Sequence, residues 1–383
     1  MLRIIGYASL LVKPTACIMK TMKKNLMGYG FLIIAALILI EIGSYFYEKN
    51  IKFNLNSPIV TNTKALTKDT PKDPKSAANS VQVSGWVAWW KEKEAYATIE
   101  KYHSNLSSIS PVWFELNTKS KIDEVGTMDK AAIVSKLKSY GLKVIPTLGS
   151  SEIKSTELST FLNDPIETNL FIDSLITRLT TLKVDGIDLD FEDIKLADKD
   201  KFTAFVTRLE QKTSKNNLTL SVTIHAKTGN NDWEGSLGQD TQQIGQLADE
   251  VRVMAYDYHT KDSGAGAITP TNWLQNVVKY SQQNIPKEKL VIGLPSYGYV
   301  WNKNGDFGDF QYDEFVNFTS KTKPTITRDT ESGEQVYNDT AYVGWLSDAT
   351  AISKKVTTVQ TMGVNRIVIW NIGGMDNSFF SSL

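Results

Sequence analysis

Three carboxyl groups stand at every second position of one apolar run, the segment Asp185-Gly-Ile-Asp188-Leu-Asp190-Phe-Glu192. In a β-strand successive side chains point to opposite faces, so Asp188, Asp190 and Glu192 share one face and apolar side chains occupy the other. Carboxyl groups about 6–7 Å apart repel one another, and each loses water when it is buried. Because such a row opposes folding, it indicates chemistry. We call these three residues the acidic row.

Two other interpretations of the acidic row are weaker. A calcium loop of the EF-hand type needs a glycine turn and polar residues, whereas Ile, Leu and Phe separate these acids. A solvated charged face would require an exposed antiparallel edge, but the run is apolar on its other face. Asp185 stands at an odd-numbered position and so falls on the other face of the strand. We expect it to be structural and to fix the turn into the strand.

From residue 81 onward, short β-rich runs alternate with longer amphipathic stretches, a pattern typical of strand-helix units around a parallel sheet. The helical stretches are 129–140, 166–182, 198–213, 272–283 and 348–362. The predicted strands are 81–88, 109–116, 142–148, 184–192, 218–225, 250–256, 290–294 and 366–371. Such units in about 300 residues predict an α/β fold, a (β/α)8 TIM barrel.

The longest interruption, residues 298–345, follows the seventh predicted strand and is predicted to be a small α+β insertion. Within it, residues 325–337 are typical of a hairpin that turns at Ser332-Gly333. An open doubly wound sheet is the alternative fold. That fold would carry a glycine-rich phosphate loop near its first strand, and Ser84-Gly85-Trp86 is not one.

In a TIM barrel the active site lies at the carboxyl ends of the strands, so Glu192 is the member of the acidic row most exposed to substrate. Mutual repulsion and burial should make the row titrate as a coupled set that shares a proton. A carboxylic acid kept protonated near neutral pH can protonate a leaving group. The row therefore predicts a general acid of the kind that glycosidic bond cleavage requires.

The segment from Asp185 to Glu192 resembles the D-G-x-D-x-D-x-E signature of glycoside hydrolase family 18, the chitinase-like family. The resemblance extends over residues 81–383. Met254-Ala-Tyr256-Asp257 is similar to the family's M-x-Y-D motif, and Trp370 stands where the family has its eighth-strand tryptophan. The sequence is most similar to the bacterial branch of spore-cortex and cell-wall N-acetylglucosaminidases.

The resemblance implies a retaining hydrolase of β-1,4-linked N-acetylglucosamine glycans such as peptidoglycan or chitin. Glu192 would protonate the glycosidic oxygen while the acetamido oxygen of the substrate attacks the anomeric carbon. Asp190 would orient the acetamido N–H, and Asp188 would share a proton with Asp190. Tyr256 would hydrogen-bond the acetamido carbonyl. The alternative is a chitinase-like lectin that binds sugar without turnover, and the intact Glu192 favours the enzyme.

The resemblance also implies a substrate-binding set around these catalytic residues. Trp370 would form the apolar floor under the sugar ring, because a flat aromatic face suits axial C–H groups. Asp257, Met254, Tyr297 and Trp86 complete the predicted set.

Several other residues are candidates for lining the site. His225 ends the fifth predicted strand and His259 follows the sixth, but the two histidines lack the spacing of a metal site, and we expect neither a metal nor a cofactor. The family often has S-x-G-G at the third strand, whereas this chain has Thr147-Leu-Gly149-Ser150-Ser151. Further tryptophans that could stack on sugars are Trp89, Trp90, Trp113, Trp233 and Trp301.

The first 80 residues differ in character from the rest. Residues 1–25 are a basic leader, and residues 26–47 carry Glu41 as their only charge and are long enough to cross a bilayer. Lysines on the amino-terminal side favour a cytoplasmic start and a catalytic domain outside the cell membrane. A cleaved signal peptide and a secreted protein are the alternative. Residues 48–80 are too polar to fold and are predicted to be a flexible linker.

The composition gives no sign of a nucleic-acid partner. The 383 residues carry 42 basic and 42 acidic side chains, and nothing in this balance indicates nucleic acid. The single cysteine, Cys17, cannot form a disulfide within the chain. We expect a monomer whose partners are the glycan and, through its amino-terminal segment, the membrane.

Overall fold

The computed structural model describes four stretches of the chain, residues 81–229, 233–302, 305–322 and 324–383. The predicted leader 1–25, apolar segment 26–47 and linker 48–80 lie outside the described residues. No helix in the described stretches is long and apolar enough to cross a bilayer. The membrane anchor therefore stays a prediction.

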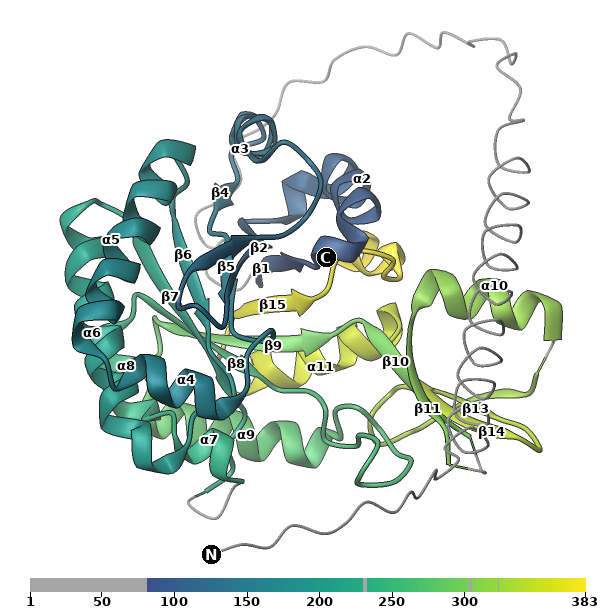
Figure 1. Cartoon of the computed structure of the whole chain (residues 1–383). Coiled ribbons are helices and arrows are strands. Elements are labelled where there is room, and N and C mark those ends of the chain that lie inside the picture. The colour runs from purple at the N-terminus through teal and green to yellow at the C-terminus, as the bar shows by residue number, and fades with distance from the viewer. Residues whose placement is uncertain (1–80, 230–232, 303–304, 323) are drawn as a thin grey trace, which may run out of the picture. The chain divides into compact units, whose positions relative to one another are not determined.

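Eight parallel strands form the centre of the fold (Figure 1). They are β1 (Gln82–Val87), β2 (Ser108–Leu116), the split pair β4 (Lys143–Val144) and β5 (Thr147–Gly149), β6 (Gly186–Asp190), β7 (Thr219–His225), β8 (Glu250–Met254), β9 (Leu290–Pro295) and β15 (Arg366–Trp370). β1 pairs with both β2 and β15, which closes the ring. The short strand β3 (Ile122–Glu124) adds to β2 antiparallel. The predicted eight-stranded parallel barrel is confirmed.

The third barrel strand is interrupted at Pro146, which has no N–H to contribute to a ladder. β4 and β5 both pair with β2, and the register between β2 and β5 shifts between Val112 and Phe114. The Pro146 carbonyl accepts a hydrogen bond from the N–H of Asp188 at 2.9 Å. This bond and the parallel pairing of Thr147 with Asp188 keep the split strand aligned with β6.

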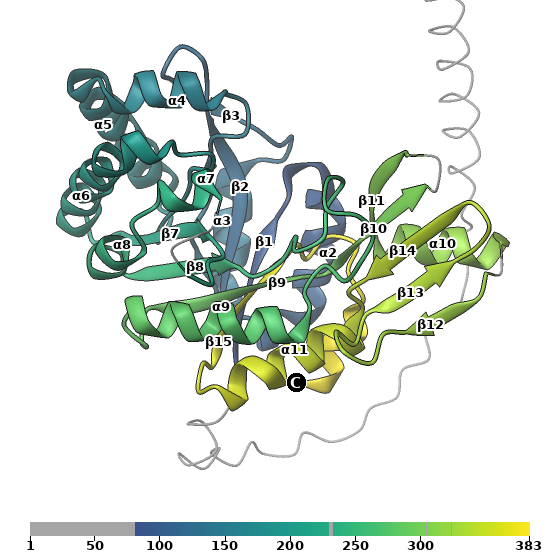
Figure 2. The same ribbon diagram turned by 90° about the horizontal axis from the view of Figure 1, so that it is seen from below.

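Helices cover the outside of the barrel (Figures 1 and 2). They are α2 (Glu92–Tyr102), α3 (Lys130–Ser139), α4 (Ser155–Leu162), α5 (Pro165–Leu182), α6 (Lys199–Lys215), α7 (Glu234–Leu237), α8 (Thr241–Leu247), α9 (Thr271–Asn284) and α11 (Ala349–Thr361). The helices α3, α5, α6, α9 and α11 coincide with the predicted helical stretches, whereas α2, α4, α7 and α8 were not predicted.

Aspartates fix where several of these helices begin. The carboxylate of Asp129 accepts the N–H groups of Ala131 and Ala132 ahead of α3, and Asp164 does the same ahead of α5. Pro165 then occupies the first position of α5, where a missing N–H costs nothing. These caps satisfy N–H groups that have no partner inside the helix.

The two faces of each barrel strand meet different surroundings. Ile187, Leu189 and Phe191 are fully buried in the apolar core beneath the helices. Residues of the opposite parity point into the barrel, where Asp188 and Arg252 are fully buried. The barrel interior is therefore partly polar, and its polar groups must pair with one another.

An insertion between β9 and β15 forms its own sheet beside the barrel (Figures 1 and 2). Its strands run in the order β11-β10-β14-β13-β12, all antiparallel, and one helix packs on them. The elements are β10 (Tyr297–Asn302), β11 (Phe307–Gln311), α10 (Tyr312–Thr322), β12 (Ile326–Arg328), β13 (Gln335–Asn338) and β14 (Tyr342–Leu346). They occupy the segment predicted as an α+β insertion, and β12 and β13 form its hairpin.

Buried ionic contacts join the insertion to the barrel. The Glu334 carboxylate accepts the N–H groups of Ile268 and Thr269 at 2.8 and 3.0 Å and lies 3.0 Å from the Lys355 ammonium. Both side chains of this ion pair are at most 1% exposed. Charges buried without a partner would be costly, so these contacts hold the insertion in one orientation.

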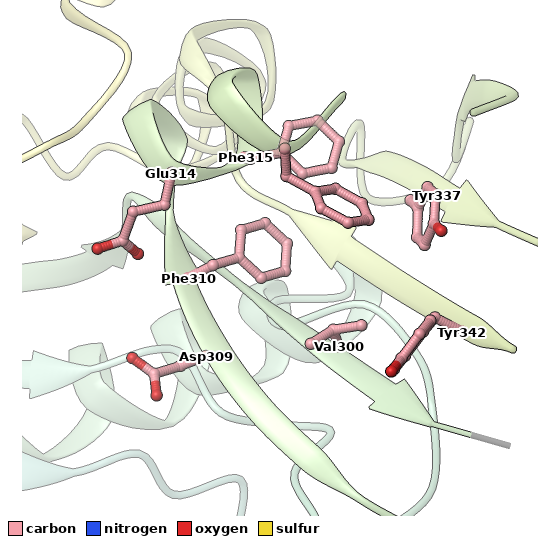
Figure 3. A pocket seen from close by; sticks show the side chains of 8 residues that line it. Val300, Asp309, Phe310, Glu314, Phe315, Tyr337 and Tyr342 are labelled. Carbon is pink, nitrogen blue, oxygen red and sulfur yellow. The ribbon is translucent and has the colours of Figure 1, made fainter. Parts of the chain in front are cut away.

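A cavity of about 320 Å³ lies between α10 and the sheet of the insertion (Figure 3). It is mostly apolar and is lined by Val300, Asp309, Phe310, Glu314, Phe315, Phe318, Tyr337 and Tyr342. None of these residues belongs to the acidic row or to its predicted partners, so we assign the cavity no part in the chemistry.

Candidate active site

The acidic row becomes progressively more exposed toward the carboxyl end of β6. Asp188 is fully buried, Asp190 is partly covered, and the Glu192 side chain is 47% exposed. Strand β6 ends at Asp190 rather than at Glu192 as predicted. The strand stops there because the N–H of Glu192 donates to the Ser150 hydroxyl at 3.1 Å instead of joining a strand ladder.

Four side chains contact the Asp188 carboxyl group. Its Oδ2 accepts from the Trp86 indole at 2.8 Å and the Thr147 hydroxyl at 3.0 Å, and it lies 3.2 Å from the Arg252 guanidinium. Its Oδ1 accepts from the Thr223 hydroxyl at 3.0 Å. Thr147, where the family often has serine, thus donates its hydroxyl to Asp188. Both oxygens of Asp188 thus accept from donors other than Asp190, and the sharing of a proton between Asp188 and Asp190 stays a prediction.

Arg252 was missed by the sequence analysis. It is fully buried, and its guanidinium also donates to the Ser110 hydroxyl at 2.6 Å and contacts the Glu250 carboxylate at 3.3 Å. Glu250 in turn pairs with Arg366. Alternating charges therefore run through the barrel interior from Arg366 to Asp188. The signal was present in Val-Arg-Val, where a charged residue interrupts an apolar strand.

Asp190 lies between this ion pair and the open end of the barrel. Burial raises its pKa well above the usual range, and the negative charges of Glu192, Asp188 and Glu115 raise it further. Arg252 opposes this shift. Among the described residues its Oδ1 has no hydrogen-bond partner. Asp190 is therefore a neutral acid with one buried oxygen available to a ligand.

Glu192 has the pKa expected of an acid that works near neutrality. Burial raises its pKa to about 7, and repulsion from Asp193, Asp257 and Glu115 contributes. Its carboxyl group is open to solvent on one side while protein surrounds it on the others. The group can therefore both hold a proton near neutral pH and reach a substrate.

Three tyrosines gather around Asp257. Asp257 has a positive φ of 62°, and its Oδ1 accepts from the hydroxyl groups of Tyr297 and, at 2.9 Å, Tyr299. The Tyr256 ring packs edge-on to Tyr297 at 6.2 Å. Burial raises the pKa of Tyr256 above its usual range, and the nearby carboxyl groups add to this effect. Tyr256 therefore remains a neutral hydrogen-bond donor.

Aromatic rings form the base of the site. Trp370 packs edge-on against Trp86 at 6.0 Å and against Trp90 at 6.2 Å. Trp86 is buried in a small apolar cluster that Trp370 and Tyr256 cover, and Met254 is 9% exposed beside the end of β8. Every predicted substrate-binding residue thus comes from the carboxyl end of a barrel strand or from the segment that follows it.

The other candidate tryptophans fall into an exposed group and a buried group. Trp89, Trp90 and Trp233 are 42%, 54% and 52% exposed. Trp113 and Trp301 are only 3% and 8% exposed, and Trp86 is only 2% exposed, so burial contradicts sugar stacking on any of the three. Trp86 instead packs edge-on against Trp370.

A second missed residue, Glu115, faces the acidic row from β2. It is 5% exposed and accepts hydrogen bonds from the N–H and the hydroxyl of Ser151, both at 3.2 Å. A Cβ atom at Gly149 would lie 2.6 Å from a Glu115 oxygen, so any other residue there would displace the Glu115 carboxyl group. Burial raises the pKa of Glu115 to about 7.

The model of the family described as glycosyl hydrolases family 18 matches residues 85–376. The chain belongs to glycosyl hydrolase family 18. The matched range includes the whole acidic row, Tyr256 and Trp370. The chain is therefore a glycosidase, and the resemblance inferred from the motifs is confirmed.

Individual relatives have low sequence identity to this chain, but their matches cover most of it. The uncharacterized glycosylase YvbX of Bacillus subtilis is 23% identical over 301 residues, which cover 76% of this chain and 87% of that protein. The cortical fragment-lytic enzyme of Bacillus cereus is 23% identical over 262 residues, 63% of this chain and 59% of that protein. A chitinase structure from Chromobacterium violaceum aligns with a TM-score of 0.72 at 17% identity, over 79% of this chain and 98% of that one. At this identity the structural likeness shows the fold alone.

In this family 18 chain, the described residues contain no group of three His, Cys, Asp or Glu side chains that could hold a metal ion. His259 binds the Ala267 carbonyl oxygen through Nδ1 at 2.8 Å. His225 instead lies beside Glu192, with Nε2 3.6 Å from Oε2. The two histidines therefore have different surroundings, and only His225 contacts the acidic row.

Replacing Glu115 by glutamine should raise the free energy of unfolding above pH 7 and change it little near pH 4. The folded chain binds the Glu115 proton more tightly than the unfolded chain, because its pKa rises from an ordinary 4.5 to about 7. Folding is therefore penalised increasingly as pH rises through this window, by about 1–3 kcal/mol when complete. Urea unfolding at pH 4 and pH 8 measures the difference. An equal change at both values would contradict it.

Proposed function

We propose that this glycosidase is a retaining hydrolase of β-1,4-linked N-acetylglucosamine glycans, peptidoglycan or chitin-like, that acts outside the cytoplasm by substrate-assisted catalysis. One observation carries the proposal. Of the carboxyl groups around the open end of β6, Glu192 alone combines an exposed side chain with a pKa near 7. It is the group suited to act first as general acid and then as general base.

The site offers no carboxylate suited to attack the sugar. Glu115 is buried, and burial raises its pKa to about 7 although the hydrogen bonds from Ser151 oppose the shift, so much of it is neutral near pH 7. Asp257 has two phenol donors on one oxygen, and burial raises its pKa. Retaining enzymes that use a protein nucleophile need an ionised carboxylate about 5 Å from the acid. We therefore infer that the acetamido oxygen of the substrate is the nucleophile.

We assign the remaining residues of the site to binding and orienting the sugar. The free Oδ1 of Asp190 would bind the acetamido N–H and so aim its oxygen at the anomeric carbon. The neutral Tyr256 phenol would donate to the acetamido carbonyl, and Asp257 with Tyr297 would bind a sugar hydroxyl. Trp370 would support the ring, with Trp86 and Met254 beneath and beside it. Positioning of this kind is a large part of catalytic power.

The location follows from the apolar segment 26–47, for which we propose a single membrane span with the barrel outside the cytoplasm. Mass spectrometry of the mature protein tests this proposal. An amino terminus near Ser44 would replace the anchor by a cleaved signal peptide. We expect the protein to be monomeric, which light scattering of residues 81–383 would check.

The substrate class is tested by product analysis. Purified protein should release N-acetylglucosamine-containing fragments from chitooligosaccharides or peptidoglycan, with the β configuration retained in the first product. Oligosaccharides that carry a free amine in place of the acetamido group at the reacting sugar should not be cleaved. Cleavage of these deacetylated sugars at the same rate would rule out substrate assistance, and binding of the glycans without cleavage would favour a lectin.

A further inference from the structure

His225, the last residue of β7, places its imidazole next to the acidic row. Its Nε2 lies 3.6 Å from Oε2 of Glu192, and the side chain is 14% exposed. Nε2 is buried, and the described part of the chain supplies no hydrogen-bond partner to it. The Glu192 carboxyl is therefore the polar group toward which this nitrogen is directed.

The approach of the two side chains is built by the backbone. Gln239, which is fully buried, accepts from the N–H of His225 at 2.8 Å and donates to the carbonyl of Phe191 at 3.0 Å. One amide therefore ties the end of β7 to the residue that precedes Glu192. The indole of Trp233 packs edge-on to the imidazole at 4.7 Å and limits its rotation.

Burial and the nearby Lys227 ammonium keep His225 neutral. Burial lowers its pKa to about 4, and the Lys227 ammonium lowers it further. The charged groups in its surroundings are Lys227 and Glu192, and Glu192 in turn faces Asp193, Asp257 and Glu115. A neutral imidazole carries one N–H. If the imidazole hydrogen were on Nδ1, Glu192 would donate its own proton to Nε2, and that proton would point away from the substrate. With the hydrogen on Nε2, the imidazole donates to Glu192 instead, and the Glu192 proton stays available to the substrate.

We propose that His225 is a positioning residue for Glu192, in which Nε2–H donates to Oε2 and leaves Oε1 to carry the catalytic proton. The inference rests on the proposed function of Glu192 as the acid. As the glycosidic C–O bond breaks, the proton leaves Oε1 for the departing oxygen, and His225 keeps its own proton. Its hydrogen bond strengthens as Glu192 becomes a carboxylate, because charge-assisted bonds are stronger than neutral ones. The same bond holds the carboxylate in place when it later accepts a proton from water.

The test compares His225→Phe, which keeps a ring against Trp233, with His225→Gln, whose amide nitrogen can reach the position of Nε2. On chitooligosaccharides the phenylalanine variant should lose about 10- to 100-fold in kcat, and the glutamine variant should recover most of it. On a dinitrophenyl chitobioside, whose leaving group needs no proton, the phenylalanine variant should lose less than about threefold. Without its donor Glu192 holds its proton more tightly, so the alkaline limb of activity should move to higher pH.

Equal losses on the two substrates, or an unchanged alkaline limb, would overturn the proposal and leave His225 a packing residue. If the phenylalanine variant does not fold, His225→Leu gives the same comparison with a smaller apolar side chain. Failure of the proposed function would look different. Glu192→Gln would then retain activity on chitooligosaccharides, whatever the His225 variants do.

Discussion

Replacing Glu192 by glutamine should lower the rate of chitooligosaccharide hydrolysis by about 10²- to 10⁴-fold, the usual contribution of a general acid. The amide keeps the size of the side chain but has no acidic proton to transfer. Because the Glu192 side chain is 47% exposed, the variant should fold with undiminished stability. Initial rates on a soluble oligosaccharide measure the loss, and Glu152→Gln is the control, since Glu152 is an exposed acid outside the proposed machinery.

The pH dependence should change along with the rate. In the proposed mechanism Glu192 acts in its protonated form, and its pKa is about 7, so wild-type kcat/KM should fall as pH rises above that value. Glutamine does not titrate, and the residual activity of the variant should lack this alkaline limb. The dinitrophenyl substrate should be affected least, because its leaving group departs without a proton. A variant with wild-type rates and an unchanged alkaline limb would refute the assignment of Glu192.

Replacing Arg252 by methionine should destabilise the protein by about 3–5 kcal/mol, the cost of removing one partner of a buried ion pair. The change leaves the Asp188 carboxylate inside the barrel without the guanidinium that lies 3.2 Å from it. It also removes the donor to Ser110. The free energy of unfolding from urea titration measures the loss.

Two further variants separate the ion pair from simple packing. Combining Arg252→Met with Asp188→Asn removes both charges, and the double variant should be more stable than Arg252→Met alone. Lys212→Met breaks an exposed pair with Asp173 and should cost less than about 1 kcal/mol. If Arg252→Met cost no more than Lys212→Met, the buried pair would have no special effect on stability.

Residue periodicity was enough to predict the barrel and the acidic row. Alternation in residues 184–192 predicted that Asp188 and Asp190 point inward, because the opposite face is uniformly apolar and must meet the helices. Periodicity did not predict where the strand ends. β6 stops before Glu192 because the Ser150 hydroxyl, 42 positions away in the sequence, takes the Glu192 N–H. Contacts between such distant residues leave no trace in local periodicity.

Two functional neighbours were missed for different reasons. Arg252 could have been found, since a charged residue of inward parity in an apolar strand needs a buried partner. Glu115 could not have been found by counting from Ser110, which points inward at the start of β2. The register shift between Val112 and Phe114 reverses the parity that follows, so that Glu115 turns toward the acidic row. A bulge of this kind depends on the neighbouring strand, interrupted at Pro146.

The insertion enters and leaves the barrel at almost the same point, since β10 and β14 pair from Gly298 with Leu346 onward. A short loop could therefore join β9 directly to α11, and in topological terms the insertion is dispensable. In chemical terms it is not, because β10 carries Tyr297 and Tyr299, the two phenols that hold Asp257. A protein engineer who wished to shorten this enzyme would have to replace those two hydroxyl groups before removing the rest.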